Sequence, residues 1–345
     1  MFRRVVFVVL ALFVSSAALA QEQLSGVVRD GGGAVVAGAT IEVRQASSNF
    51  DILVAFVSAL GVSVSAQQPA PKTGILLLAH GGQPQWNQRV EDVVKRVDAA
   101  MPAEVAFGMA TRANLQSAID KLTARGVTEV ITVPLFVSSH SSVITSTEFL
   151  LGLRQDAPAD LAKFAKMDHR AHGPAADSHA SHADPSSPVT TTARVRMTPA
   201  FNRHDIIGAI VADRAKSISR TPSAEAVIIV AHGPVPEDDN QKWLADMAVL
   251  AQKVKASAPY ASVDYMTVRD DAGPAIRDAA TAELRGKVSA QGAQGRRVLI
   301  VPHLMSFGGI EQGLRKRLEG LDYTMTAQGL MPDDRIVDWV LASAR

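Results

Sequence analysis

Two histidines of this chain occupy nearly identical sequence contexts, and both could bind a metal ion. Ala79-His80-Gly81 follows the apolar run 74–78, and Ala231-His232-Gly233 follows the apolar run 226–230. Imidazole nitrogens bind divalent metals without help from thiolates and leave other coordination positions open for water or substrate. The alternative is that both are turn residues whose imidazoles cap a helix or bond to the backbone. Recurrence of the context favours the metal ligand, above all at His80.

Two further histidines lie close to the third apolar run of each half of the chain. His140 follows the run that ends at Pro134, and His303 directly follows Pro302. In parallel α/β sheets, ligands bind outside the carboxyl ends of the strands. We therefore expect all four histidines to face one crevice, with His80, His140, His232 and His303 as candidate metal ligands.

The similarity between the two halves extends well beyond the histidines. It includes two asparagines, Asn87 and Asn240, and the segments 109–112 and 266–269, which read Met-Ala-Thr-Arg and Met-Thr-Val-Arg. Two copies indicate a pair of similar lobes, because a solenoid needs at least three repeats. We place the first lobe at residues 73–220 and the second at 221–345.

The first half contains an insertion that the second lacks, and four of the nine histidines lie in it, within residues 168–184. Histidine-rich tracts bind metals, and the surrounding Ala, Ser, Pro and Asp residues cannot build a core. Two interpretations remain open. The segment is either a flexible loop that gathers metal ions or a disordered linker with incidental histidines.

Short runs rich in Val, Ile and Leu alternate with helical patterns, which indicates buried parallel strands with crossover helices. A helix over 86–100 has the amphipathic period expected of a helix that packs on a sheet. The sequence thus predicts an α/β protein with two similar lobes, each a four-stranded, mainly parallel sheet flanked by helices. The expected strands are 74–79, 103–109, 128–134 and 193–197 in the first lobe, and 225–231, 261–268, 296–302 and 322–327 in the second.

Composition favours a protein that acts on small molecules. The 345 residues include 35 basic and 34 acidic ones, a formal net charge of +1. No run of Lys or Arg is present, so the electrostatic footprint of a nucleic-acid-binding protein is missing.

The first residues predict export, to the periplasm in our interpretation. Residues 1–20 have the basic start, apolar stretch and small-residue cleavage site of a secretory signal peptide. Residues 21–50 resemble a fragment of a carboxypeptidase-regulatory-like β-sandwich. Residues 51–72 contain a second apolar, signal-like segment and a linker, and this segment is too short to span a bilayer comfortably. We expect no stable membrane span in the mature chain.

Several motifs together resemble a known family. An apolar strand that ends in His80-Gly81, then Asn87, then a strand Val133-Pro-Leu-Phe136 that leads to His140, and a closing helix over 206–214 are similar to the class II chelatases. These are the CbiX-type cobaltochelatases and the sirohydrochlorin ferrochelatases. The resemblance extends from Gly74 to Val340. The family's usual second histidine position is occupied by Ser142, two residues after His140.

This resemblance implies a fold, a substrate and an active site. A four-stranded parallel sheet is expected in each lobe, with a tetrapyrrole between the lobes, cobalt or iron as the substrate metal, and no ATP. His80 would be the metal ligand and proton acceptor, with His140 as the second histidine. Glu148, placed at the head of the next helix, could assist proton removal, although an acidic residue there is also common as compensation of the helix dipole.

A substrate with many carboxylates also needs cationic and polar partners, because Arg pairs well with carboxylates. The candidates are Arg112, Arg269, Ser138 and Asn87. The alternative for the arginines is that they are solvated or ion-paired on the surface. Overall, we expect an enzyme that inserts cobalt or iron into sirohydrochlorin or a related tetrapyrrole. An exported metal- or tetrapyrrole-binding protein without catalytic activity is the alternative.

Overall fold

The computed structural model describes residues 28–29, 63–64, 71–166, 184–307 and 309–345. The predicted signal peptide, nearly all of segments 21–50 and 51–72, and the histidines of the 168–184 insertion lie outside the described residues. Residues Met1–Ala70 and Pro71–Arg345 form two separate units. In the first, β1 (Val28–Arg29) pairs with β2 (Ser63–Val64) in antiparallel orientation.

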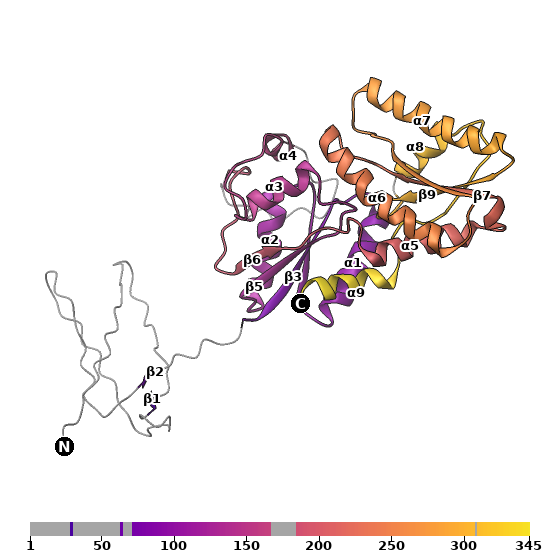
Figure 1. Ribbon diagram of the computed structural model, residues 1–345. Coiled ribbons are helices and arrows are strands. Elements are labelled where there is room, and N and C mark those ends of the chain that lie inside the picture. The colour runs from indigo at the N-terminus through magenta and orange to yellow at the C-terminus, as the bar shows by residue number, and fades with distance from the viewer. Residues whose placement is uncertain (1–27, 30–62, 65–70, 167–183, 308) are drawn as a thin grey trace, which may run out of the picture. The chain divides into compact units, whose positions relative to one another are not determined.

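The second unit contains two four-stranded sheets that have the same strand order (Figure 1). The elements of the first lobe are β3 (Thr73–Ala79), α1 (Pro84–Asp98), β4 (Ala103–Phe107), α2 (Arg112–Ala124), β5 (Glu129–Pro134), α3 (Ser142–Leu150), α4 (Leu161–Ala165) and β6 (Arg194–Met197). Those that follow are α5 (Asp205–Ile218), the 3₁₀ turn Pro222–Ala224, β7 (Glu225–Ala231), α6 (Glu237–Ser257), β8 (Ser262–Thr267), α7 (Pro274–Ala293), β9 (Arg297–His303), α8 (Ile310–Arg317), β10 (Thr324–Met325) and α9 (Asp334–Ser343).

All strand pairs in both sheets are parallel, in the orders β4-β3-β5-β6 and β8-β7-β9-β10. The predicted fold class is therefore confirmed. The central strands β3 and β7 are buried on both faces, which explains why their sequences are continuous apolar runs without alternation.

Helix α1 illustrates how the sequence sets an element that covers a sheet. Its buried residues Trp86, Val90, Val93 and Val97 recur at helical spacing, so one face of the helix is apolar. Pro84 is accommodated in the first turn, where its missing N–H would have no partner within the helix. Two basic residues in the last turn interact favourably with the negative end of the helix dipole.

The helices that follow the last strand of each sheet pack across the boundary between the lobes. Helix α5 follows β6 of the first sheet, yet it packs against α6 and β9 of the second. Helix α9 ends the second lobe, yet it lies against α1 of the first (Figure 1). In space, α5 thus covers the second sheet although it precedes every strand of that sheet. The boundary predicted between residues 220 and 221 stays a prediction.

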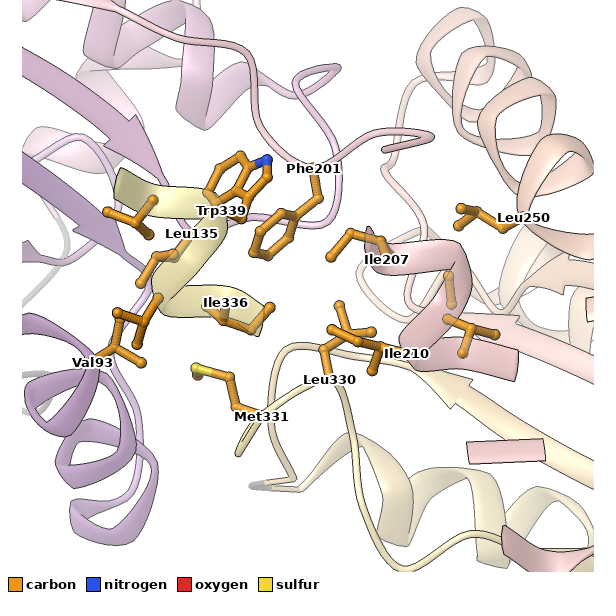
Figure 2. Close-up of a cluster of buried hydrophobic side chains, with 14 of the residues drawn as sticks. Val93, Leu135, Phe201, Ile207, Ile210, Leu250, Leu330, Met331, Ile336 and Trp339 are labelled. Atoms are coloured by element: carbon orange, nitrogen blue, oxygen red, sulfur yellow. The ribbon is translucent and has the colours of Figure 1, made fainter. Parts of the chain in front are cut away.

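One apolar core joins the two lobes. Figure 2 shows Trp339 of α9 beside Phe201 and Ile336 of α9 on the side of Val93 of α1, while Ile207 and Ile210 of α5 lie toward the second lobe. Two smaller cores lie on the outer faces of the sheets, one under α2, α3 and α4 and the other under α7 and α8. Burial of this shared core contributes roughly 25 cal/mol for each Å² of apolar surface, so the two lobes stabilise each other.

None of the helices in the described residues is both long enough and apolar enough to span a membrane.

Candidate functional site

His80 and His232 lie directly after β3 and β7, the two corresponding strands of the lobes. In both residues, Nδ1 lies within hydrogen-bond distance of the carbonyl oxygen of the next glycine, at 2.8 Å for His80 and 2.7 Å for His232. Both glycines have the positive φ that this tight turn requires, 78° for Gly81 and 80° for Gly233. The repeated sequence therefore builds the same local geometry twice.

This contact indicates which nitrogen of each ring carries a proton. A carbonyl oxygen only accepts hydrogen bonds, so Nδ1 must donate its proton. In the neutral imidazole of His80 the lone pair then lies on Nε2, which is the nitrogen that can bind a metal ion, whereas Nε2 of His232 faces a carboxylate. A bond from the imidazole to the backbone is expected for a turn residue, but it also orients histidines that bind metals. This contact therefore does not distinguish the two interpretations.

Asp271 in the loop after β8 adds a carboxylate that our sequence prediction missed. Its Oδ2 lies 3.3 Å from Nε2 of His232. Burial acts to lower the pKa of His232, but the hydrogen bonds with Asp271 and the Gly233 carbonyl and the nearby negative charges outweigh it and raise this pKa. The only signal in the sequence is the pair Asp270-Asp271 directly after the repeated Met266–Arg269 segment.

Asp271 also connects the two lobes electrostatically. The hydrogen bond with His232 is the main cause that lowers the pKa of Asp271, and burial opposes it. Positive charge on His232 and on His80 lowers this pKa further. The charge of His80 in the first lobe therefore reaches a carboxylate of the second, and the structure pairs that carboxylate with His232.

His140 lies in the loop between β5 and α3 and is half-buried. Its backbone N–H donates to the Ser138 hydroxyl at 3.1 Å, and its carbonyl accepts from the Trp243 indole at 2.8 Å. Since β5 is the neighbour of β3 in the sheet, His140 and His80 follow adjacent strands, as the sequence predicted.

His303 differs from the expectation that all four histidines face one crevice. It is the last residue of β9, pairs with Ala231 of β7, and is only 2% exposed. Burial lowers its pKa to about 4, and Nδ1 has no hydrogen-bond partner among the described residues. Because β9 continues one residue past Pro302, the side chain enters the packed sheet and does not reach an open crevice.

Within residues 71–166, 184–307 and 309–345, no group of three or more His, Asp or Glu side chains is arranged to hold a metal ion. The four predicted ligands do not converge as a set. The assignment of a metal to His80, His140 and His232 stays a prediction.

The arginines predicted to bind substrate have other partners. Arg269 is 5% exposed, and its guanidinium donates to the carbonyls of Pro234 and Val235 and to the Glu237 carboxylate. It clamps the turn after His232. Arg112 is buried and donates to the Pro188 carbonyl. Both guanidiniums hold neighbouring loops, and Arg269 also forms an ion pair with the exposed Glu237 carboxylate.

The remaining predicted residues also organise loops. The Asn87 side chain accepts from the Gly82 N–H at 2.8 Å, which orders the turn after His80. Ser138 is buried beneath His140 and accepts its N–H. The placement of Glu148 was wrong, because it lies in the second half of α3 and not at the head. Compensation of the helix dipole at the N-terminus therefore does not explain it either.

Comparison with known proteins agrees with this architecture. The CbiX family model matches residues 74–218, which is less than half of the chain. A sirohydrochlorin cobaltochelatase of Methanothermobacter thermautotrophicus is 30% identical over 90 residues, which are 25% of this chain. The match spans 63% of that relative's length.

A solved structure described as SirB from Bacillus subtilis with Fe3+ has the same fold. It is 16% identical, covers 79% of this chain and 94% of its own, and superposes with a TM-score of 0.51. The CbiX match includes His80, His140 and the strands β3 and β5 that precede them. Residues 74–218 are therefore similar to the CbiX family, and the second unit has the fold of the solved SirB structure.

Proposed function

We propose that this protein is a metal chelatase that inserts cobalt or iron into sirohydrochlorin or a related tetrapyrrole. The observation that supports this most directly is His80. It lies within the CbiX match, at the carboxyl end of a central strand, with Nδ1 bonded to Gly81 so that Nε2 has the lone pair. Sirohydrochlorin is the substrate named for the relative of Methanothermobacter thermautotrophicus.

In this proposal, His80 presents the metal ion to the macrocycle through Nε2, and His140 approaches from the adjacent strand. Insertion of a divalent metal releases two protons from the pyrrole nitrogens, so the site needs proton acceptors as well as a ligand. Asp271 and the imidazole of His232 are held together at 3.3 Å and lie near His80. The Asp271 carboxylate is the group placed to accept a proton, because both ring nitrogens of His232 are already engaged, Nδ1 with Gly233 and Nε2 with Asp271. The reaction as proposed uses no ATP.

An absorbance assay tests the function. The full chain is mixed with sirohydrochlorin and Co(II) or Fe(II), and the spectrum is followed over time against a sample without protein. We expect the absorbance of the metallated product to grow with each turnover. A spectrum that shifts once, in proportion to the amount of protein, and then stays constant would contradict catalysis.

That second outcome would support an exported metal- or tetrapyrrole-binding protein without catalytic activity. The observation in favour of this alternative is the presence of two signal-like segments, residues 1–20 and the apolar stretch near 52–64. We propose export to the periplasm, with the apolar segment near 52–64 as the protein's own signal and residues 1 to about 50 as an added leader. Sequencing the mature N-terminus tests this. A start near Gln67 is expected, whereas a start at Gln21 that retains the intervening segment would argue against it.

A further inference from the structure

The first helix of each lobe contacts the third-strand loop of the other lobe. Arg89 of α1 donates to the Ser306 hydroxyl in the loop after β9. Trp243 of α6 donates to the His140 carbonyl in the loop after β5. Since α1 and α6 are corresponding elements, the two contacts are reciprocal. The loop that contains His140 is therefore held by a residue of the second lobe. That residue, Trp243, lies outside residues 74–218, the region that the CbiX model matches.

Backbone hydrogen bonds fix His140 on both sides. Its N–H donates to Ser138 within the loop, and its C=O accepts from Trp243 across the lobe boundary. The Trp243 ring is itself buried, so the donor is rigid. With both backbone groups held, the remaining freedom of His140 is the rotation of its side chain.

Asp246 lies on the same helix as Trp243. It lies three residues after Trp243 on α6, and residues at this spacing share one face of a helix. Its Oδ2 is buried and has no hydrogen-bond partner among the described residues. Burial raises the pKa of Asp246, and positive charge on His140 and Arg203 opposes this. The carboxylate therefore lies within electrostatic reach of the imidazole.

We propose that Trp243 and Asp246 of the second lobe are positioning residues for His140 of the first. Trp243 fixes the backbone of the loop, and the Asp246 carboxylate sets the orientation of the imidazole ring. At metal sites a histidine commonly donates its second ring N–H to a carboxylate, and Oδ2 of Asp246 is an acceptor without a partner among the described residues. The proposal deepens the proposed function and rests on it, because His140 needs an orientation only if it takes part in the reaction.

The side-chain resonances of the histidines test the positioning without any assay of activity. In the full chain, His140→Gln identifies the His140 signals in a long-range nitrogen–proton NMR spectrum. We expect Asp246→Asn and Trp243→Phe each to shift these signals and to leave those of His303 unchanged. The matched control is Asp239→Asn, which also removes one negative charge from α6. Asp239 pairs with Lys242. This substitution should shift neither signal.

His140 signals that match wild type in Asp246→Asn would overturn the proposal. Should Asp246→Asn fail to fold by circular dichroism, Asp246→Glu keeps the charge but moves the carboxylate by one methylene. It must then shift the same resonance, and an unchanged signal in that folded variant would also overturn the proposal.

Kinetics with sirohydrochlorin and Co(II) complete the test. We expect Asp246→Asn to lower kcat by about 10- to 100-fold, the usual effect of removing the partner of a metal-site histidine, and to leave KM unchanged. Asp239→Asn should keep both constants. If the wild-type protein shows no turnover, the proposed function fails, while the NMR result still decides whether α6 orients His140. Shifted His140 signals with unchanged kcat would overturn the role of this orientation in the reaction.

Discussion

The two Ala-His-Gly motifs have the same backbone geometry but different neighbours. His232 has the Asp271 carboxylate at 3.3 Å. Alignment of Arg112 with Arg269 pairs Asp271 with Asn114 of the first lobe, and the amide of Asn114 donates to the Phe107 carbonyl. Only the second copy thus supplies an acid at this position. The sites of the two lobes therefore differ in residue type at this position.

Substitution of Gly233 tests the turn that orients His232. Gly233 has a φ of 80°, and a Cβ there would lie 2.5 Å from Cβ of Thr267. We expect Gly233→Ala to destabilise the protein by about 2 kcal/mol or more, because both the left-handed backbone and the overlap are unfavourable. Urea unfolding measures this change.

Gly286 in α7 provides the matched control, because a Cβ there would meet no atom within 4 Å. Gly286→Ala should stabilise the protein by about 0.5–1 kcal/mol, since it lowers the cost of ordering the helix. Equal effects of the two substitutions would contradict the account of the turn.

The burial of His303 predicts a pH dependence of stability. Its pKa falls from 6.5 to about 4 in the folded protein, so the unfolded chain binds a proton first as the pH drops. The sign follows directly. This group destabilises the folded state progressively below pH 6.5, and the full difference corresponds to about 3 kcal/mol near pH 4.

We therefore expect the free energy of unfolding to fall less between pH 7 and pH 5 in His303→Leu than in wild type. His204→Asn, at an exposed histidine, should keep the wild-type dependence. Identical slopes for wild type and His303→Leu in urea titrations would show that His303 is not buried in its neutral form.

At the scale of residues, the sequence predicted where the candidate site residues lie better than it predicted which groups they contact. Repeated spacing was enough to place His80, His140 and His232 after strands. It could not reveal that β9 extends to include His303, or that Arg269 turns inward onto the carbonyls of Pro234 and Val235. Both outcomes depend on tertiary contacts between segments that are distant in the chain.

At the scale of elements, hydrophobic periodicity predicted both sheets and their connecting helices. The predicted helix 86–100 is observed as α1 (Pro84–Asp98), and the predicted strand 322–327 is reduced to Thr324–Met325. The destination of α5 and α9 could not be predicted. An amphipathic pattern shows that a helix buries one face, but it does not specify which sheet it covers.

Hydrogen bonds help to fix these two helices in place. Arg214 of α5 donates to the carbonyls of Gly329 and Leu330, just before α9. Arg335 of α9 in turn pairs with Asp213 of α5 at 2.8 Å. The two helices that pack across the lobe boundary are therefore tied to each other as well as to the opposite lobe.

At the scale of the whole molecule, the shared core predicts that damage to the last helix loosens the first lobe. Trp339 of α9 is 3% exposed, and its ring centroid lies 4.3 Å from that of Phe201. Trp339→Ala should destabilise the protein by about 3–5 kcal/mol, the usual cost of removing a large buried ring.

The location of the effect is the sharper test. Hydrogen exchange followed by mass spectrometry measures this. Trp339→Ala should increase the exchange rate more in α1 and β3, which lie far from Trp339 in the chain, than in α7 and β8 of the second lobe. The exposed neighbour Asp338→Ala should leave exchange unchanged. Faster exchange confined to the second lobe would show that α9 does not support the first.

The central claim is that His80 delivers the metal ion, and turnover of matched histidine variants tests it most directly. Wild type, His80→Ala and His204→Ala are compared with sirohydrochlorin and Co(II), with folding checked by circular dichroism. His204 is exposed, and its Nδ1 accepts the Ile206 N–H at the start of α5. We predict that His80→Ala lowers the rate of metal insertion by at least about 100-fold and that His204→Ala keeps most of it. Equal turnover in wild type and folded His80→Ala would contradict the account.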